Sequence, residues 1–488
     1  MNPKHQLKKG YVLIPLLVFA SIAILVISAL ITFTNTNLRA GRQSVQREEA
    51  FQAAEAGIEY YRWHLAHAPT DYTDGTGTPT PSVHNFYDKN GNLIGTYTLT
   101  ITPPPIGSTL VKIKSEGRSF ADPLAKRTIV SQLAVPSFAK YAFVSNSDMR
   151  FGQGTEVFGP IHSNGGIRFD GLAHNLVTSA LATYNDPDHD ESGSDPHEFG
   201  VHTHVNTPPS SGINDNFRPA EAPPNSVPAR TDVFVIGRQF PVPAVDFAGI
   251  TADLSNMKTD AQTNGRYLAP SGAQGYRLVL KTNGTFDVFR VTSLRNPPSQ
   301  CTNTDNQTGW GTWSVNNSSL VGNYPYPVNG IIFVEDHAWV EGQINNTRVT
   351  IAAARFPDNP STRPSITVNN NLLYTDYDGS DVIALIAQNN FNVGMMSATT
   401  LRIDAAVIAQ NGRVGRYFYE SDCSPYHLRS TITLYGILGT ALRYGFAYTN
   451  GSGYAIRNII YDSNLLYAPP PAFPLTSDQY QIVSWEEE

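Results

Sequence analysis

The first 67 residues constrain this chain more than any other part of it. A short head ends in Lys8-Lys9-Gly10, and an unbroken apolar run of 23 residues follows, from Tyr11 to Phe33. About 20 apolar residues suffice to cross a bilayer as a helix. A secretory signal peptide has a shorter apolar core and a small-residue cleavage site behind it, whereas here the Lys-Lys-Gly sequence precedes the run. Cleavage after Gly10 would therefore leave the apolar helix on the mature chain.

The flanks of the run predict its orientation. Lys4, Lys8 and Lys9 should stay on the cytoplasmic side, which sends the rest of the chain outside. The polar residues within the run, Ser21, Ser28 and Thr32, can bond carbonyls one helical turn back and are therefore tolerated in lipid. An ordinary signal anchor would share these features, so the run alone leaves that alternative open.

A helical pattern continues beyond the run. Val45, Phe51, Ile58, Tyr61 and Leu65 recur on one broad face, and no proline occurs between Pro15 and Pro69. A single helix over residues 16–67 would be about 75 Å long. A membrane anchor needs no such extension, but a filament subunit does, because its helices pack side by side in a bundle.

Two segments together resemble a known family. Gly10-Tyr11-Val12-Leu13-Ile14 and the segment 47–57, Arg-Glu-Glu-Ala-Phe-Gln-Ala-Ala-Glu-Ala-Gly, are similar to the N-terminus of PilX-type minor pilins of type IV pili, over about 60 residues. The resemblance implies a class III prepilin that a prepilin peptidase cleaves after Gly10, with methylation of Tyr11. It also implies other pilin subunits as partners, a single-pass precursor in the inner or cytoplasmic membrane, and a later place in the pilus or at the cell surface.

One departure from the pilin pattern bears on the role. Bulk pilins usually carry Glu at the fifth mature position, where this chain has Pro15. Proline is acceptable in the first turn of a helix, where its missing N–H has no partner to lose, but it cannot supply a carboxylate. We therefore expect a minor, priming or tip position.

Composition indicates an exported, β-rich protein. The 488 residues include 38 Gly and 24 Tyr, and only 15% are charged. The net charge of −7 argues against nucleic-acid binding. Cys301 and Cys423 could form a disulfide in an oxidising compartment, or could be two separate thiols.

Period-two patterns after the helix predict strands. Tyr97, Leu99 and Ile101 alternate with threonines, and similar alternation recurs near residues 111–113 and 129–135. Asn90-Gly91 is a hairpin-type turn. A small antiparallel sheet packed on the end of the long helix is expected, as in a pilin.

From about residue 137 short apolar strands repeat. Met149–Gly154 is echoed 18 residues later by Ile167–Gly171, and Leu385–Asn389 is echoed 22 residues later by Val407–Asn411. Such periods indicate stacked rungs of a β-solenoid, or β-helix, whose inward faces are buried only by stacking. Irregular packing of two sheets is the alternative.

The repeats are interrupted near the middle of the chain. Residues 206–229 are rich in Pro and Ser and resemble a linker, and Asp246 is expected to cap a helix that buries Phe247, Ile250, Leu254, Met257 and Ala261. Asn283-Gly284 predicts a hairpin.

The predicted fold class is mainly β with one long N-terminal helix, a small antiparallel sheet, and a solenoid-like head with an α+β insertion. The predicted organisation is a leader at 1–10, a membrane and filament helix at 11–67, a small β region at 68–136, a first solenoid part at 137–205, a linker at 206–229, an inserted α+β subdomain at 230–328, and a second solenoid part with the C-terminal tail at 329–488.

An acidic and histidine-rich segment is the most conspicuous candidate metal site. Asp186, Asp188, Asp190 and Glu191 would suit Ca²⁺, whereas the nearby His189, His197, His202 and His204 would suit Zn²⁺. The spacing matches no defined metal-binding loop, so a solvated mobile loop is the alternative. No cofactor is expected apart from this Ca²⁺ site. The shorter run Asp376–Asp381 indicates a polar turn more than a Ca²⁺ loop.

Catalysis is not expected. The sequence holds no Gly-x-Ser-x-Gly, His-Glu-x-x-His or phosphate-loop motif. Asp376, Asp378, Arg402 and Asp404 could be arranged as in a polysaccharide-cleaving solenoid enzyme, and His162 with Ser163 could be a nucleophile pair, but polar turns explain these residues equally well. Stacking of sugar rings is another use for aromatic side chains; the candidates are Tyr324, Tyr326, Tyr417, Tyr419 and Tyr426.

The sequence thus predicts a minor pilin-like subunit whose helix anchors it in the membrane and then enters a filament, displaying a β-rich head for adhesion, including to surface or host glycans, or for priming or capping assembly. The rivals are a membrane-anchored surface protein that never joins a filament, and a polysaccharide-degrading enzyme carried on a pilin-type export segment.

Overall fold

The computed structural model describes residues 13–104, 108–189, 197–215, 219–475 and 479–488. The chain forms two compact units. We call Met1–Pro103, Val111–Leu133 and Tyr480–Glu488 the helix unit, and Pro104–Leu110 and Ala134–Gln479 the head unit. Together they are mainly β with one long N-terminal helix, which confirms the predicted fold class.

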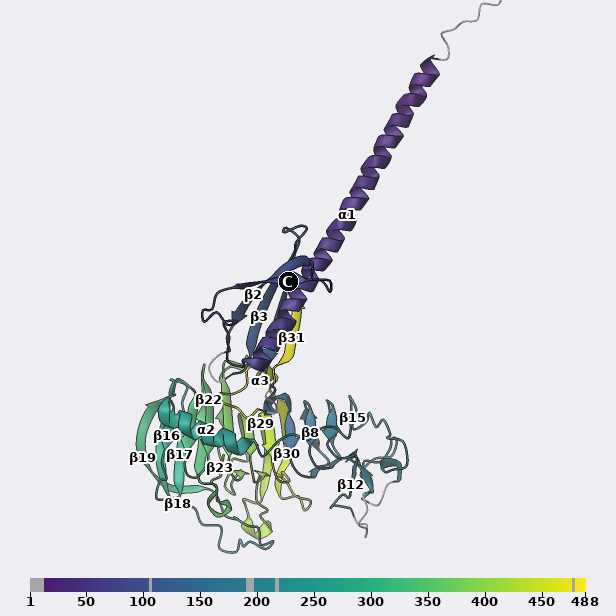
Figure 1. The fold of residues 1–488 in the computed structure, drawn as a ribbon. Helices are drawn as coiled ribbons and strands as arrows, with labels where there is room; N and C mark the ends of the chain where they lie inside the picture. Colours follow the sequence, from purple (N-terminus) through teal and green to yellow (C-terminus); the bar gives the residue numbers. More distant parts are fainter. Residues whose placement is uncertain (1–12, 105–107, 190–196, 216–218, 476–478) are drawn as a thin grey trace, which may run out of the picture. The chain divides into compact units, whose positions relative to one another are not determined.

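The helix unit is built on α1, Leu13–His67, a helix of 55 residues (Figure 1). It runs unbroken through the predicted range. Its buried side chains all lie in the C-terminal third: Ala50, Ala53, Ala54, Gly57, Ile58, Tyr61 and Leu65. This spacing of three and four residues puts them on one face.

A five-stranded sheet covers that face. Its order is β1-β2-β3-β4-β31, with bounds Ser82–Tyr87, Leu93–Thr102, Val111–Ser119, Lys126–Ala134 and Gln481–Glu487. The pairs β1–β2, β2–β3 and β3–β4 are antiparallel, as the alternation predicts. In β3 the burial alternates residue by residue, with Val111 and Ile113 facing the core.

Strand β31 corrects one predicted boundary. The prediction that the tail belongs with the solenoid is wrong for residues 480–488, because the small sheet takes them as its last strand (Figure 1). The N–H of Glu488 donates to Thr128 O, and Ser131 Oγ donates to Ser484 O. This register indicates that β31 runs opposite to β4, whose edge groups would otherwise lack partners.

The head unit holds a 21-stranded sheet in which neighbouring strands are mostly parallel. Along one row the pairs are β20–β22, β22–β25, β25–β27, β27–β29, β29–β5, β5–β8 and β8–β11. Their bounds are Ile331–Val334 (β20), Arg348–Ala353 (β22), Val382–Ala387 (β25), Thr400–Ala409 (β27), Leu428–Thr440 (β29), Phe143–Ser145 (β5), Ile161–Ser163 (β8) and Val177–Ser179 (β11).

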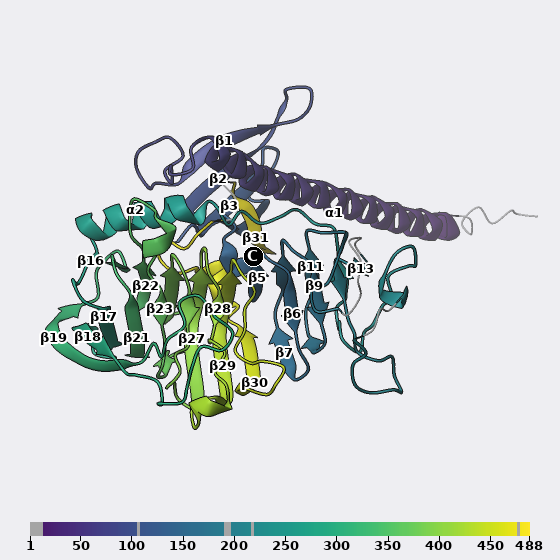
Figure 2. The ribbon, with the colours of Figure 1, turned by 90° about the horizontal axis from the view of Figure 1, so that it is seen from below.

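The sequence echoes are neighbouring strands in register. Met149 of β6 pairs with Ile167 of β9, and Leu385 of β25 pairs with Val407 of β27, both in parallel. This is the stacking that the solenoid prediction requires. Figure 2 shows these strands side by side across the head.

Strand order in the head differs from chain order. β5, near the start of the unit, pairs with β29, near its end. The two predicted solenoid parts are therefore joined into one sheet through the last long strands and not through the segment that links them in sequence.

The α+β segment belongs to the same sheet. β16 (Arg266–Leu268) pairs with β20, and β17 (Gly275–Leu280) pairs with β21 (Ala338–Gln343), both in parallel. The expected hairpin at Asn283-Gly284 joins β17 to β18 (Thr285–Leu294), and β19 (Val315–Pro325) pairs antiparallel with β18. The segment is thus one end of the stack and not a separate subdomain, because β20 and β21 need partners for their edge groups.

The remaining elements of the head are short, apart from β30. They are β6 (Met149–Phe151), β7 (Thr155–Phe158), β9 (Ile167–Phe169), β10 (Leu172–Ala173), β12 (Thr183–Tyr184), β13 (Glu198–Phe199), β14 (Val201–His202), β15 (Arg238–Gln239), β23 (Ile366–Thr367), β24 (Leu372–Leu373), β26 (Phe391–Asn392), β28 (Val414–Gly415), β30 (Gly453–Tyr461) and the helix α3 (Asn464–Tyr467).

Helix α2, Ile250–Thr263, covers one face of the head sheet (Figure 2). Its buried side chains are those predicted, and Leu254 and Met257 join a cluster with Phe333, Ile386 and Ile408 of the strands. The cap differs: Asp246 Oδ1 accepts from the N–H groups of Ala248 and Gly249, so it closes the turn ahead of the helix. Because both faces of the central strands are buried, every residue of β25 is buried, as parallel strands require.

Candidate functional site

The N-terminal half of α1 is an exposed apolar rod. From Leu13 to Phe33 its large apolar side chains are exposed on all sides of the helix; Phe19 is 72% and Leu25 is 69% exposed. At 1.5 Å per residue these 21 residues span about 31 Å, close to the apolar thickness of a bilayer. Among the described residues, this is one helix that by length and composition could cross a membrane.

Hydroxyl groups within the rod bond to the helix itself. Ser21 Oγ donates to Leu17 O and Thr32 Oγ1 donates to Ser28 O, each at 2.8 Å. These bonds confirm the expectation for Ser21 and Thr32. They satisfy the hydroxyl donors without water, as a lipid environment requires.

The C-terminal part of α1 is fastened to its sheet by close backbone approach. A Cβ added at Gly57 would lie 2.3 Å from Ser115 Oγ, and one added at Gly117 of β3 would lie 2.0 Å from Ala50 O. Small residues are therefore required on both sides of this contact. At the start of the contact, Ser119 Oγ donates to Glu49 at 2.6 Å.

A turn after the helix holds its last residues. Asp71 accepts from the N–H of Thr73 at 2.9 Å and of Gly75 at 2.7 Å, and it lies 2.9 Å from His64 Nε2. The bonds from Thr73, together with those from Gly75 and His64, lower the pKa of Asp71 to about 2 although burial opposes them. Tyr61 donates to Asp71 O at 2.8 Å, so the same turn ties the helix face to the loop.

The predicted processing residues Gly10 and Tyr11 lie outside the described residues, and the cleavage and methylation stay predictions. Pro15 is described, and it lies in the first turn of α1, where a proline is tolerated.

The predicted acidic metal set is divided by the fold. Asp186 is buried at 3% exposure, whereas Asp188 points to Arg443 and forms an ion pair with it. Asp190 and Glu191 lie outside the described residues. Beside Asp186 lie two histidines instead: His202 Nε2 is 3.5 Å and His204 Nε2 is 4.0 Å from Asp186 Oδ2.

This cluster is buried, so a solvated loop is the wrong description for its described members. Glu198, His202 and His204 are at most 1% exposed. Burial, and then the charge of Arg168, lower the pKa of His204 to about 3, which keeps its imidazole neutral. Contacts with His202 and Arg168 hold the pKa of Asp186 well below its usual range, although burial opposes them.

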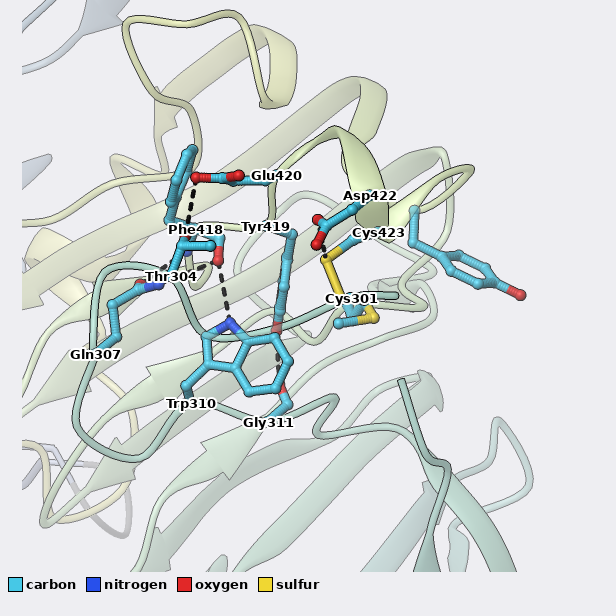
Figure 3. The surroundings of a disulfide bond; sticks show 12 residues. Cys301, Thr304, Gln307, Trp310, Gly311, Phe418, Tyr419, Glu420, Asp422 and Cys423 are labelled. Atoms are coloured by element: carbon cyan, nitrogen blue, oxygen red, sulfur yellow. Dashed lines mark hydrogen bonds between the residues drawn. A yellow bond between two sulfur atoms is a disulfide. The ribbon is translucent and has the colours of Figure 1, made fainter. Parts of the chain in front are cut away.

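The structure joins Cys301 and Cys423 by a disulfide across 122 residues of sequence. Figure 3 shows the bond beside Trp310 and Tyr419, with Tyr419 donating to Gly311 O at 2.7 Å and Trp310 Nε1 donating to Phe418 O at 3.1 Å. The loop around Cys301 is thus held to the segment after β28 by hydrogen bonds as well as by the covalent bond.

The residues considered for catalysis are otherwise engaged. Asp404 is fully buried; it accepts from Tyr377 OH at 2.6 Å and from Arg402 Nε at 2.8 Å, while Asp376 and Asp378 are exposed. His162 Nδ1 lies 3.0 Å from Thr178 Oγ1, and Ser163 Oγ donates to Ser147 O. Neither arrangement aims a base at a nucleophile.

The five candidate sugar-binding tyrosines are largely packed inside the head. Tyr417 and Tyr419 are at most 3% exposed and lie in the cluster around the disulfide, and Tyr324, Tyr326 and Tyr426 are half-buried. Their packing explains their presence in the sequence without a ligand.

Comparisons with known proteins add little detail. No family model matches the chain, and no curated protein matches it. Among solved structures it is similar to the competence-associated pilin ComZ from Thermus thermophilus, at 16% sequence identity and a TM-score of 0.29, covering 91% of this chain and 97% of the ComZ chain. At that score the likeness carries no argument about this chain.

Proposed function

We propose that this protein is a minor subunit of a type IV pilus or a related filament. The observation that carries the proposal is α1: one continuous helix whose first 21 described residues are apolar and exposed on every side, and whose last 18 are packed on a small sheet. An apolar surface of that size needs cover from lipid, from other helices, or from both in turn. A subunit stored in the membrane and then packed by its helix into a bundle uses both.

The precursor would span the inner or cytoplasmic membrane once, with the lysines of its head in the cytoplasm. Prepilin peptidase would cleave after Gly10 and Tyr11 would be methylated, as the resemblance to PilX-type pilins implies. The mature chain would then lie in the pilus or at the cell surface, with other pilins as its partners.

We assign a minor, priming or tip position because Pro15 stands where bulk pilins carry Glu. The bulky head fits the same assignment, since its sheet of 21 strands far exceeds the five strands that pack on the helix. In this proposal the head is displayed for adhesion, including to glycans, or for capping assembly, and it needs neither catalysis nor a nucleic-acid partner.

The proposal is tested by shearing filaments from cells that express the full chain and analysing the fraction by N-terminal mass spectrometry. We expect a peptide that begins at methylated Tyr11, at far less than one copy per major subunit. A Gly10→Val precursor, which the peptidase should not cut, is the control and should remain with the membranes.

An intact Met1 start that is found with membranes alone would overturn the proposal and favour the signal-anchored surface protein. The enzyme rival makes a different prediction: the sheared protein would shorten a polysaccharide, and Asp404→Asn would abolish that cleavage. We expect no cleavage by either form.

A further inference from the structure

A buried cluster in the head unit has the chemistry of a transition-metal site. Strand β14 carries His202, and His204 follows two residues later, so the two imidazoles leave the strand on the same side. His202 pairs in register with Arg168 of β9. Asp186 comes just after β12 and its carboxylate faces both imidazoles.

The spacing of these atoms suits a shared ion better than hydrogen bonds. Asp186 Oδ2, His202 and His204 offer ligand atoms that all lie within 4.8 Å of one another. The separations of 3.5 Å and 4.0 Å from Asp186 Oδ2 exceed the roughly 2.7–2.9 Å of a charge-assisted hydrogen bond. Two ligands of one tetrahedral Zn²⁺, each about 2.0–2.2 Å from the metal, lie about 3.3–3.6 Å apart.

Polar atoms in the cluster lack the partners that burial demands. Among the described residues, neither ring nitrogen of His202 has a hydrogen bond, nor does Asp186 Oδ2 or Glu198 Oε1. All three side chains are at least nine-tenths buried. Leaving buried polar groups unbonded is costly, and a metal ion would satisfy the two that face each other directly.

The local charge also fits a divalent cation. The described carboxylates in and around the cluster are five, namely Asp170, Asp186, Asp188, Glu198 and Asp215, and the guanidinium groups that contact them are three, namely Arg150, Arg168 and Arg443. With neutral imidazoles the sum is −2. Arg168 is itself held by Asp170 at 2.7 Å and by Asp215, so its charge is shared with those carboxylates.

A route to the surface is present. A cleft of about 780 Å³ in the head unit is lined by Arg150, Asp188, Asp215 and Arg443, the same side chains that surround the cluster. A hydrated cation attracted to these carboxylates could reach the imidazoles from this cleft.

We propose that the head binds one transition-metal ion of the Zn²⁺ class through Asp186 Oδ2, His202 Nε2 and His204 Nε2. Two imidazoles select against Ca²⁺, which prefers oxygen ligands, so the site differs from the acidic Ca²⁺ loop expected from the sequence. The ion ties the segment after β12 to the strand β14. Glu198 and His189, whose Oε1 and Nδ1 are 3.7 Å apart, lie next to His204 and complete the surroundings of the site.

The test uses the full chain in detergent, purified without a polyhistidine tag. It is stripped with a chelator, reloaded with Zn²⁺, dialysed, and assayed for metal by mass spectrometry. We expect one Zn²⁺ per chain and a melting temperature raised by about 3 °C or more, with no effect from Ca²⁺ at the same concentration. Co²⁺ in place of Zn²⁺ should give the visible absorption of a tetrahedral site.

Two variants separate this site from adventitious binding. His202→Ala should weaken Zn²⁺ binding at least as much as losing an outer-shell partner does, about 10–100-fold. His174→Ala removes a part-exposed histidine that pairs with Glu156 outside the cluster, and it should keep the full metal content. Because His202→Ala could disturb folding, the Co²⁺ spectrum and Zn²⁺ content of the unaltered chain decide independently.

Less than about one tenth of an equivalent of Zn²⁺ on the unaltered chain, with no Co²⁺ absorption, would overturn the proposal. Equal loss of Zn²⁺ in His174→Ala and His202→Ala would also overturn it. Neither result bears on filament membership, which is read from the sheared fraction.

Discussion

At the scale of single residues, the smallest side chains decide how α1 meets its sheet. The sequence pattern correctly placed Ile58, Tyr61 and Leu65 on the buried face, but it also placed Val45 there, which is 57% exposed. The contact begins instead with Ala50, Ala53 and Ala54, and it is closest at Gly57. Hydrophobic periodicity does not register such residues, because what matters here is the absence of a side chain.

The glycine contact leads to a paired prediction within α1. Gly57→Ala and Gly41→Ala make the same chemical change in the same helix, and both gain about 1 kcal/mol of helix propensity. A Cβ at residue 41 meets nothing within 4 Å, whereas one at residue 57 meets Ser115 Oγ, Tyr97 and Leu99. We expect Gly57→Ala to be about 1–3 kcal/mol less stable than Gly41→Ala, because the contact is overpacked.

Hydrogen exchange of the β3 amides measures this difference in the full chain. Faster exchange is expected in Gly57→Ala and unchanged or slower exchange in Gly41→Ala. Equal protection of β3 in the two variants would contradict the close helix–sheet contact.

A second residue-scale prediction concerns acid. The pKa of Asp71 is about 2 in the folded chain, below its usual value near 4, so the folded turn favours the charged carboxylate. The stability that this carboxylate contributes is therefore fully present above about pH 4 and is lost as the pH falls through about 2. Protection of the Thr73 and Gly75 amides against hydrogen exchange should fall over that range.

Asp71→Asn should expose the same two amides already at pH 7, and their protection should then change little on acidification. Asp122→Asn is the control, because Asp122 accepts one bond from Leu124 in an exposed turn. If the variant Asp71→Asn lost protection between pH 4 and 2 as steeply as the unaltered chain, Asp71 would not be the group responsible.

At the scale of elements, the repeats show what the sequence can predict about pairing. The echo of Met149–Phe151 by Ile167–Phe169 became the parallel pair β6–β9, and the 22-residue echo became β25–β27. Neither echo predicts that β29 pairs with β5, because those strands lie about 290 residues apart and share no recognisable pattern. Long-range pairing follows from edges that must be covered, and only the assembled sheet shows which edges meet.

The disulfide element gives a third prediction. Replacing both Cys301 and Cys423 by Ser removes a link across 122 residues, and such a link typically stabilises by about 2–5 kcal/mol. We expect a lower melting temperature and faster proteolysis within residues 296–313, while the strands β25, β27 and β29 remain protected. Adding a reductant should lower the melting temperature of the unaltered chain and leave that of the double variant unchanged; an equal response of both would contradict the role of this bond.

At the scale of the whole molecule, the chain leaves the helix unit after β4 and returns to it at β31. The head is therefore an insertion between two neighbouring strands of the small sheet. The return is secured inside the helix unit: Trp485 packs edge-on against Phe51 at 6.1 Å, and Tyr480 donates to Pro69 O at 3.1 Å. A sequence reader cannot see this return, because most of β31 is exposed and its alternation is weak.

The insertion predicts that the head can be removed. A chain in which residues 135–479 are replaced by a short glycine-containing turn joins β4 directly to β31, which runs the opposite way. We expect this short chain to keep the hydrogen-exchange protection of β2 and β3 and, if assembly depends on the helix unit, to appear in the sheared filament fraction. A short chain that is folded but absent from that fraction would show that the head is needed for assembly.

By itself the sequence determined the long helix, the small antiparallel sheet and the parallel stacking, because each is written in a local period of apolar residues. It also indicated the buried face of α2 and the hairpin at Asn283-Gly284. Only the tertiary structure decided that the tail completes the small sheet, that the α+β segment extends the head sheet, and that Asp186 lies beside His202 and His204 apart from Asp188. These outcomes depend on which distant edges and buried polar groups find partners, and no local pattern encodes that choice.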